Sequence, residues 1–120
     1  MDALTLSLRV LGGRPGQEVI VPSNTYIATI LSIVQNGMIP VLVEPDIRTY
    51  NIDTDLIKEK ITKKTFAIMP VHLYGKLCKM DAIMEIAAKH DLFVIEDCAQ
   101  AHGAQYKGKK AGTFGHLNAF

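Results

Sequence analysis

An acidic residue at the end of an apolar run is the feature of this sequence with the clearest chemical potential. Leu92 to Ile95 has the composition of a buried strand, and Asp97 follows it after one further acid. In open α/β sheets, side chains at the carboxyl ends of the strands face the crevice in which ligands bind. A carboxylate placed there can hold a proton on a cationic ring nitrogen. Asp97 equally suits the N-cap of a helix that begins near Cys98, and the spacing alone leaves both interpretations open.

Strand-like and helix-like segments alternate along the chain, and these are the elements that must position Asp97. Strands separated by segments of helical length favour right-handed crossovers and a parallel sheet. We therefore expect an α/β fold of three layers, a mostly parallel sheet with helices on both faces. The polar, glycine-rich segment 103–115 is typical of a loop or a short hairpin. The expected strands cover 18–22, 40–44, 66–71 and 92–96, and the expected helices cover 2–11, 25–35, 53–61 and 80–90.

Length and composition favour one packed globular unit. The 120 residues are 48% hydrophobic, and 13 basic residues nearly balance 12 acidic ones, for a net charge of +1. A net charge this close to zero gives no excess of basic charge that would indicate binding to nucleic acid or to an anionic membrane. No run approaches the roughly 20 apolar residues of a membrane span, and the first residues show no secretory signal. We expect a cytoplasmic protein.

The cysteines and histidines do not form a recognisable metal motif. Cys78 and Cys98 have no metal-ligand spacing and form no CxxC, so they are interpreted as reduced thiols. The four histidines include no pair at helical i, i+4 spacing. We therefore predict no metal site.

Three segments in order resemble successive signatures of one enzyme family. They are 16–29 (GQEVIVPSNTYIAT), 70–75 (PVHLYG) and 95–104 (IEDCAQAHGA). The chain resembles the DegT/DnrJ/EryC1/StrS family of pyridoxal-phosphate-dependent sugar aminotransferases of fold type I. The pattern starts inside a helix and stops in an apolar run, so we interpret residues 1–120 as a partial cofactor-binding large domain, truncated at both ends.

The resemblance implies a role for three residues toward pyridoxal phosphate. Asp97 matches the aspartate that pairs with the pyridine nitrogen, and a carboxylate there favours the protonated ring that serves as an electron sink. Gln100 matches the position that hydrogen-bonds near the 3′ oxygen, since its amide can donate without adding charge. Tyr26 matches the aromatic residue that stacks on the pyridine ring. The alternative for Tyr26 is a core aromatic at the start of a helix.

Other matching residues are better interpreted as structural. His72, at a strand end, is expected to pack and hydrogen-bond rather than catalyse. Gly75 and Gly103 are expected to have positive φ or to allow close backbone approach. Asp2 corresponds to the start of the helix whose amides would hold the cofactor phosphate. Met1 stands where the family has threonine, so that phosphate site departs from the family pattern.

The resemblance further implies transfer of an amino group, from a donor such as glutamate, to a nucleotide-linked keto sugar in polysaccharide or deoxysugar biosynthesis. The segment 23–29 is similar to that of members acting at the 3-keto position of dTDP-linked deoxyhexoses. In the family, a Ser-Phe segment and then the Schiff-base lysine follow the position of Phe120, so residues 1–120 alone are expected to be inactive. A homodimer is expected for the full-length protein.

Two alternatives remain at this point. Some family members are dehydratases with histidine in place of the lysine, and that position lies outside residues 1–120. A second alternative is a flavodoxin-like phosphoacceptor or binding module with Asp97 as the acceptor. That module needs a second acidic cluster, for which Glu44 and Asp46 are candidates, and a lysine at another strand end, which the segment 66–71 does not provide.

Overall fold

Helices and strands alternate along the chain in the computed structural model, which describes all of residues 1–120. All the expected strands and helices are present, with boundaries shifted by a few residues. None of the helices is both long enough and apolar enough to span a bilayer. In chain order the elements are α1 (Asp2–Val10), β1 (Glu18–Pro22), α2 (Ile27–Val34), β2 (Ile39–Val43), α3 (Thr54–Lys60), β3 (Thr65–Ile68), the 3-10 helix η1 (Leu73–Gly75), α4 (Met80–His90), β4 (Phe93–Asp97), β5 (Gln105–Tyr106), β6 (Lys109–Lys110) and β7 (Leu117–Ala119).

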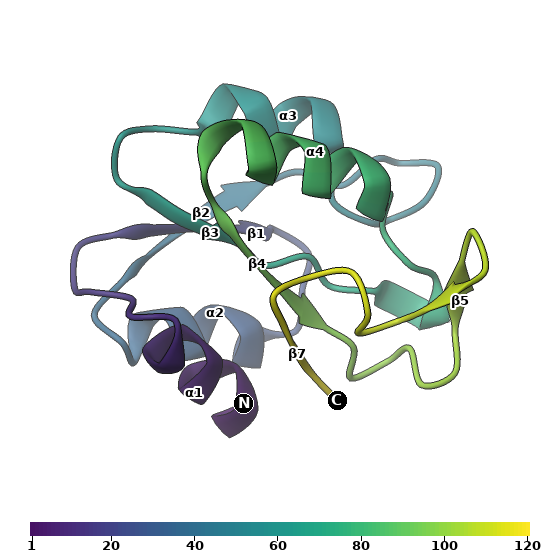
Figure 1. The fold of residues 1–120 in the computed structure, drawn as a ribbon, viewed down its shortest axis with the longest axis horizontal. Helices are drawn as coiled ribbons and strands as arrows, with labels where there is room; N and C mark the ends of the chain where they lie inside the picture. The colour runs from purple at the N-terminus through teal and green to yellow at the C-terminus, as the bar shows by residue number, and fades with distance from the viewer.

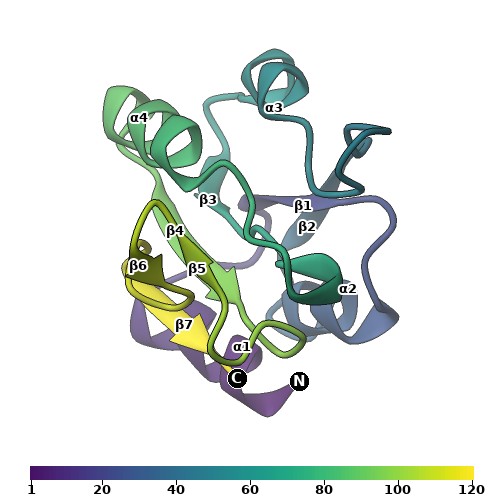
Figure 2. The ribbon, with the colours of Figure 1, turned by 90° about the vertical axis from the view of Figure 1, so that its right-hand side faces the viewer.

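A five-stranded parallel sheet lies between two helical layers (Figure 1). Its strand order is β2-β1-β3-β4-β7, and every pairing in it is parallel. Helices α1 and α2 cover one face, and α3 and α4 cover the other. The predicted three-layer α/β fold is therefore confirmed. The connection from β4 to β7 contains the small antiparallel hairpin β5–β6 instead of a helix, as Figure 2 shows from the side.

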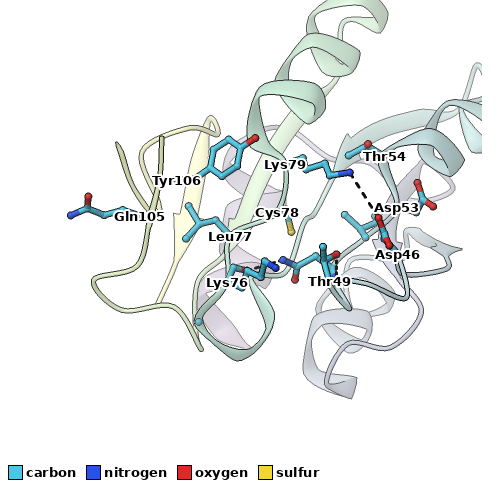
Figure 3. Close-up of a pocket in the computed structure, with 13 residues that line it drawn as sticks. Asp46, Thr49, Asp53, Thr54, Lys76, Leu77, Cys78, Lys79, Gln105 and Tyr106 are labelled. Atoms are coloured by element: carbon cyan, nitrogen blue, oxygen red, sulfur yellow. Dashed lines mark hydrogen bonds and ion pairs between the residues drawn. The ribbon is translucent and has the colours of Figure 1, made fainter. Parts of the chain in front are cut away.

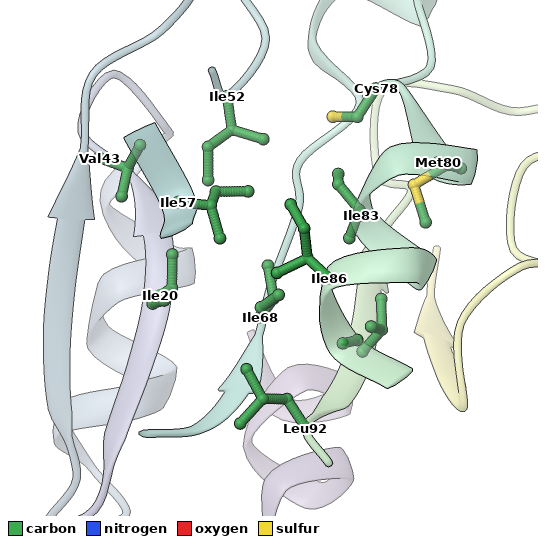
Figure 4. Packing of buried hydrophobic residues seen from close by; sticks show 12 residues of the cluster. Ile20, Val43, Ile52, Ile57, Ile68, Cys78, Met80, Ile83, Ile86 and Leu92 are labelled. Atoms are coloured by element: carbon green, nitrogen blue, oxygen red, sulfur yellow. The ribbon is translucent and has the colours of Figure 1, made fainter. Parts of the chain in front are cut away.

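The two faces of the sheet are packed by separate apolar clusters because alternate residues of a strand point to opposite faces. In β4, Val94 packs toward α3 and α4, whereas Ile95 packs toward α1 and α2. The cluster under α3 and α4 contains 12 buried residues, and Figure 4 shows Ile57, Ile83 and Ile86 closing over the sheet. Helices thus cover both faces of the sheet, and a ligand site is expected at the ends of the strands.

Strand β3 is shorter than the sequence predicts. It ends at Ile68, whereas the apolar run continues to Val71. Pro70 lies inside the run and has no N–H to donate, so the regular ladder cannot pass through it. Val71 rejoins the sheet only through an isolated bridge to Asp97.

Asp97 is the last residue of β4, and the alternative that it caps a helix is wrong. It pairs with Ala119 of β7, and residues 98–100 form a turn instead of a helix. The N–H of Ala101 donates to the carbonyl of Cys98 at 2.9 Å, which closes this turn. The carboxylate is therefore placed by a sheet end.

Ile83→Ala should destabilise the fold because it removes a fully buried side chain between α4 and the sheet. We expect the free energy of unfolding to fall by about 2–5 kcal/mol, measured by urea denaturation of the full-length protein. Lys89→Ala, on the exposed side of the same helix, is the control and should cost less than about 0.5 kcal/mol. Equal effects of the two substitutions would contradict this packing.

Candidate functional site

A cavity of about 260 Å³ opens where the carboxyl ends of the parallel strands meet. Segments that follow β1, β3 and β4 contribute to its wall, together with the end of β7 and the start of α1. Parallel strands that end at one edge place sequence-distant residues together, which is why α/β sheets bind ligands there. Its lining includes all three residues predicted from the sequence and consists of Met1, Ala3, Leu4, Thr25, Tyr26, Ala28, Thr29, Val71, Asp97, Ala99, Gln100, Ala119 and Phe120.

The carboxylate of Asp97 is held from two sides and is only 7% exposed. The N–H of Ala99 donates to its Oδ1 at 3.2 Å, and the hydroxyl of Thr29 donates to its Oδ2 at 2.9 Å. Both donors stabilise negative charge on the group. A carboxylate offers about four acceptor positions, so the protein leaves capacity on each oxygen for a cationic donor in the cavity.

Tyr26 and Gln100 line the same cavity, Tyr26 as an exposed ring and Gln100 as a side chain held by a hydrogen bond. Tyr26 precedes the first residue of α2, and 73% of its surface is exposed, so it is not the core aromatic that we considered as an alternative. Gln100 is oriented by the N–H of Tyr74, which donates to Oε1 at 2.8 Å. This contact leaves the amide NH₂ as the group that can donate to a ligand. Gly75 and Gly103 both have a φ of +75°, as expected.

The first turn of α1 gives the cavity a positive end. Ala3 and Leu4 line it, and Met1 supplies no side-chain cap, so the first N–H groups of the helix are not bound by a capping side chain. Such a helix start attracts phosphate. The cavity combines a carboxylate that can accept from a cationic ring nitrogen, an exposed aromatic ring that can stack, and helix N–H groups that can donate to a phosphate. These residues fit pyridoxal phosphate.

A second carboxylate, Glu96, points to the opposite face of β4 and is fully buried. Its Oε1 accepts from the N–H groups of Phe114 and Gly115 at 2.8 and 2.6 Å. Its Oε2 accepts from Nε2 of His72 and from the N–H of Gly112, both at 2.9 Å. Glu96 therefore fastens the segment that leads into β7, a role that sequence reasoning missed.

His72 acts as a hydrogen-bonding residue in this network, in agreement with the structural interpretation. Its Nδ1 accepts from the N–H of Cys78 at 3.2 Å, so the ring proton resides on Nε2 and is donated to Glu96. His72, Glu96 and Cys98 place ligand atoms within 4.8 Å of one another. Because both imidazole nitrogens and both carboxylate oxygens are already engaged, we interpret this cluster as structural.

A second cavity, of about 490 Å³, lies beside the loop between β2 and α3 and contains none of the predicted site residues (Figure 3). Asp46, one of its lining residues, pairs with the neighbouring Arg48 at 2.9 Å and lies 3.9 Å from Lys79. The hydrogen bond from the Arg48 side chain lowers the pKa of Asp46 to about 2. Asp46 and Asp97 thus line different cavities, so Asp46 does not form an acidic cluster with Asp97.

Comparison with known proteins identifies relatives along the whole chain. The model of the DegT/DnrJ/EryC1/StrS aminotransferase family matches residues 1–120. The dTDP-3-amino-3,6-dideoxy-alpha-D-galactopyranose transaminase of Aneurinibacillus thermoaerophilus is 62% identical over 120 residues, which are 100% of this chain and 33% of that protein. The chain therefore spans about a third of the length of the curated relatives it matches.

Solved structures agree with the fold. An aminotransferase from Psychrobacter cryohalolentis superposes with a TM-score of 0.95 at 49% identity, over 98% of this chain and 30% of that one. The structure of NtdA from Bacillus subtilis with bound cofactor PMP superposes with a TM-score of 0.87 at 43% identity, over 92% of this chain and 26% of that one. These matches show that the five-stranded sheet with its helices has the fold of part of each of these two proteins.

Glu96→Gln should destabilise the protein in a pH-dependent way. Burial works to raise the pKa of Glu96, but the donors from His72 and from the backbone at 112, 114 and 115 hold that pKa below its usual value near 4.5. A carboxyl group with a lowered folded pKa stabilises the fold above its unfolded pKa, and this contribution is lost as the pH falls through the folded value. The amide would instead point two donors at N–H groups, costing on the order of 3 kcal/mol at pH 7.

The measurement is chemical denaturation of full-length wild type and variant between pH 7 and pH 3. The difference in unfolding free energy should be largest near neutral pH and shrink below about pH 4.5. Glu85→Gln, on the exposed surface of α4, is the matched control and should show neither effect. A constant difference at every pH would show that the charge on Glu96 is unimportant.

Proposed function

The chain belongs to the DegT/DnrJ/EryC1/StrS aminotransferase family, and from this premise we propose that the protein of which it forms a part is a pyridoxal-phosphate-dependent sugar-nucleotide aminotransferase. The observation that carries the proposal is the meeting of Tyr26, Asp97 and Gln100 at one cavity. These residues come from separate parts of the chain, and each matches a position of the family pattern. Residues 1–120 form part of the cofactor-binding large domain.

Asp97, Tyr26, Gln100 and the start of α1 each have one task in this proposal. The cofactor, when bound, supplies the electron sink that amino transfer requires. Asp97 holds a proton at the ring nitrogen, and its two donors keep the carboxylate oriented for this task. Tyr26 covers one ring face and excludes water from it, while the NH₂ of Gln100 donates to the ring substituent. The N–H groups at the start of α1 bind the phosphate.

The proposed substrates follow from the chemistry of the relatives. The acceptor is a nucleotide-linked keto sugar, and the 62% identity to a transaminase named for a dTDP-3-amino sugar supports a 3-keto sugar linked to dTDP. Glutamate is the proposed amino donor, and the product would enter polysaccharide or deoxysugar biosynthesis. We propose that the enzyme is cytoplasmic and works as a homodimer.

The catalytic lysine is proposed to lie outside residues 1–120, in the segment that follows the position of Phe120. Neither Lys107, Lys109 nor Lys110 lines the cavity. Residues 1–120 alone are therefore expected to be unable to transfer an amino group, because the nucleophile and proton carrier would be absent. A histidine at that position would instead favour a dehydratase.

The direct experiment is to purify the full-length protein with pyridoxal phosphate and record its absorption spectrum. We expect a yellow protein in which borohydride fixes the cofactor to one lysine, identified by peptide mass spectrometry outside residues 1–120. Glutamate should then discharge the colour, and a nucleotide-linked keto sugar should restore it. A full-length protein that remains colourless with added cofactor would refute the proposal.

Asp97→Asn in the full-length protein should weaken cofactor retention and slow the reaction with glutamate at least about 100-fold, since the group that holds charge opposite the ring nitrogen is lost. Stopped-flow absorbance measures the rate, and dialysis measures retention. Asp91→Asn is the control, because Asp91 is exposed and ends α4 in a left-handed conformation that asparagine also adopts. An unchanged rate for Asp97→Asn would give this carboxylate another role.

A further inference from the structure

The buried hydroxyl group of Thr29 makes a hydrogen bond from a helix to the carboxylate of Asp97. Thr29 of α2 is 2% exposed, and its Oγ1 lies 2.9 Å from Oδ2 of Asp97 in β4. The apolar cluster between α1, α2 and the sheet includes Val21, Ile33 and Ile95 as buried members. A polar pair in such surroundings is costly unless both partners are satisfied, so its geometry is strongly constrained.

The direction of the hydroxyl protons can be derived from the contacts. Asp97 is only an acceptor when ionised, so Thr29 must use its single proton on the carboxylate. The Oγ1 atoms of Thr25 and Thr29 lie 2.8 Å apart, and Thr25 must therefore be the donor in that pair. The two hydroxyl groups form a short chain in which both protons point toward Asp97.

The same turn of helix positions this chain and the ring-stacking residue. Tyr26 is the N-cap of α2, its carbonyl accepts from the N–H of Thr29 at 3.1 Å, and both residues line the cavity with Asp97. The N–H of Ala99 holds the other carboxylate oxygen. Donors on both oxygens fix the rotation of the carboxylate, so that its remaining acceptor positions serve the cavity.

We propose that Thr29 is a positioning residue that orients Asp97 toward the ring nitrogen of the cofactor, with Thr25 orienting the hydroxyl of Thr29 in turn. This inference rests on the proposed function, because it assigns Thr29 a task only if the cavity binds pyridoxal phosphate. Without the hydroxyl, the carboxylate rotates more freely and loses a donor that stabilises its charge. The cofactor is then bound less tightly, because the carboxylate that pairs with its ring nitrogen is less well oriented.

The test uses the full-length protein and the substitution Thr29→Val, which preserves shape and removes the donor. The dissociation constant for pyridoxal phosphate, measured by absorbance titration and dialysis, should rise about tenfold, the loss expected for one hydrogen bond to a charged group. Thr29→Ser should restore affinity close to that of wild type. Thr25→Val should cause a smaller rise, because it removes only the outer donor.

Ser32→Ala is the matched control, because Ser32 is a fully buried hydroxyl of the same helix. It donates to the carbonyl of Thr29 at 2.7 Å and makes no contact with Asp97. It should leave cofactor affinity unchanged. If Thr29→Val fails to fold, the affinities of Thr29→Ser and Thr25→Val against Ser32→Ala still decide the question.

A readout without cofactor separates the two proposals. In the apo protein, the ¹³Cγ resonance of Asp97 should move in Thr29→Val and stay in place in Ser32→Ala. Wild-type protein that binds no pyridoxal phosphate would refute the proposed function and, with it, the role of Thr29. Wild-type protein that binds it, with equal affinity in Thr29→Val, would overturn the role of Thr29 alone.

Discussion

Two adjacent residues at the end of β4, Glu96 and Asp97, have buried carboxylates. The hydrogen bonds that these carboxylates accept determine how the neighbouring segments are held. Glu96 accepts four hydrogen bonds, which uses the acceptor capacity of a carboxylate completely. Asp97 accepts two and retains capacity on the cavity side. Because neighbouring strand residues point to opposite faces, one acid serves the fold and the other serves the site.

The fold depends on Glu96 because the connection from β4 to β7 has no helix to cover it. The hairpin β5–β6 and the following turn contribute few buried apolar side chains, and the backbone N–H groups of 112, 114 and 115 are instead bound by this carboxylate. Strand β7 thereby reaches its place beside β4, where Ala119 pairs with Asp97. Glu96, the neighbour of Asp97, thus helps to hold Ala119 and Phe120 in the wall of the cavity.

Much of this arrangement was predictable from local sequence. Apolar runs and helical periodicity predicted the strands and helices, and the motif residues Tyr26, Asp97 and Gln100 do meet at one cavity. The differences have local causes: Pro70 ended β3 early, and Asp97, for which a helix cap was the alternative interpretation, pairs with Ala119 of β7 at the end of a strand. Thr29 and Glu96 were missed although each had a signal, a threonine one turn after Tyr26 and a charge inside an apolar strand.

The sequence by itself determined the elements, their alternation and the resemblance to an aminotransferase family, because periodicity and motif spacing are properties of short segments. Only the tertiary structure decided which donors reach each carboxylate. Thr29 is 68 positions from Asp97, and His72 is 24 from Glu96. Hydrogen bonds act over about 3 Å and depend on direction, so their partners are fixed only when helices and strands have packed.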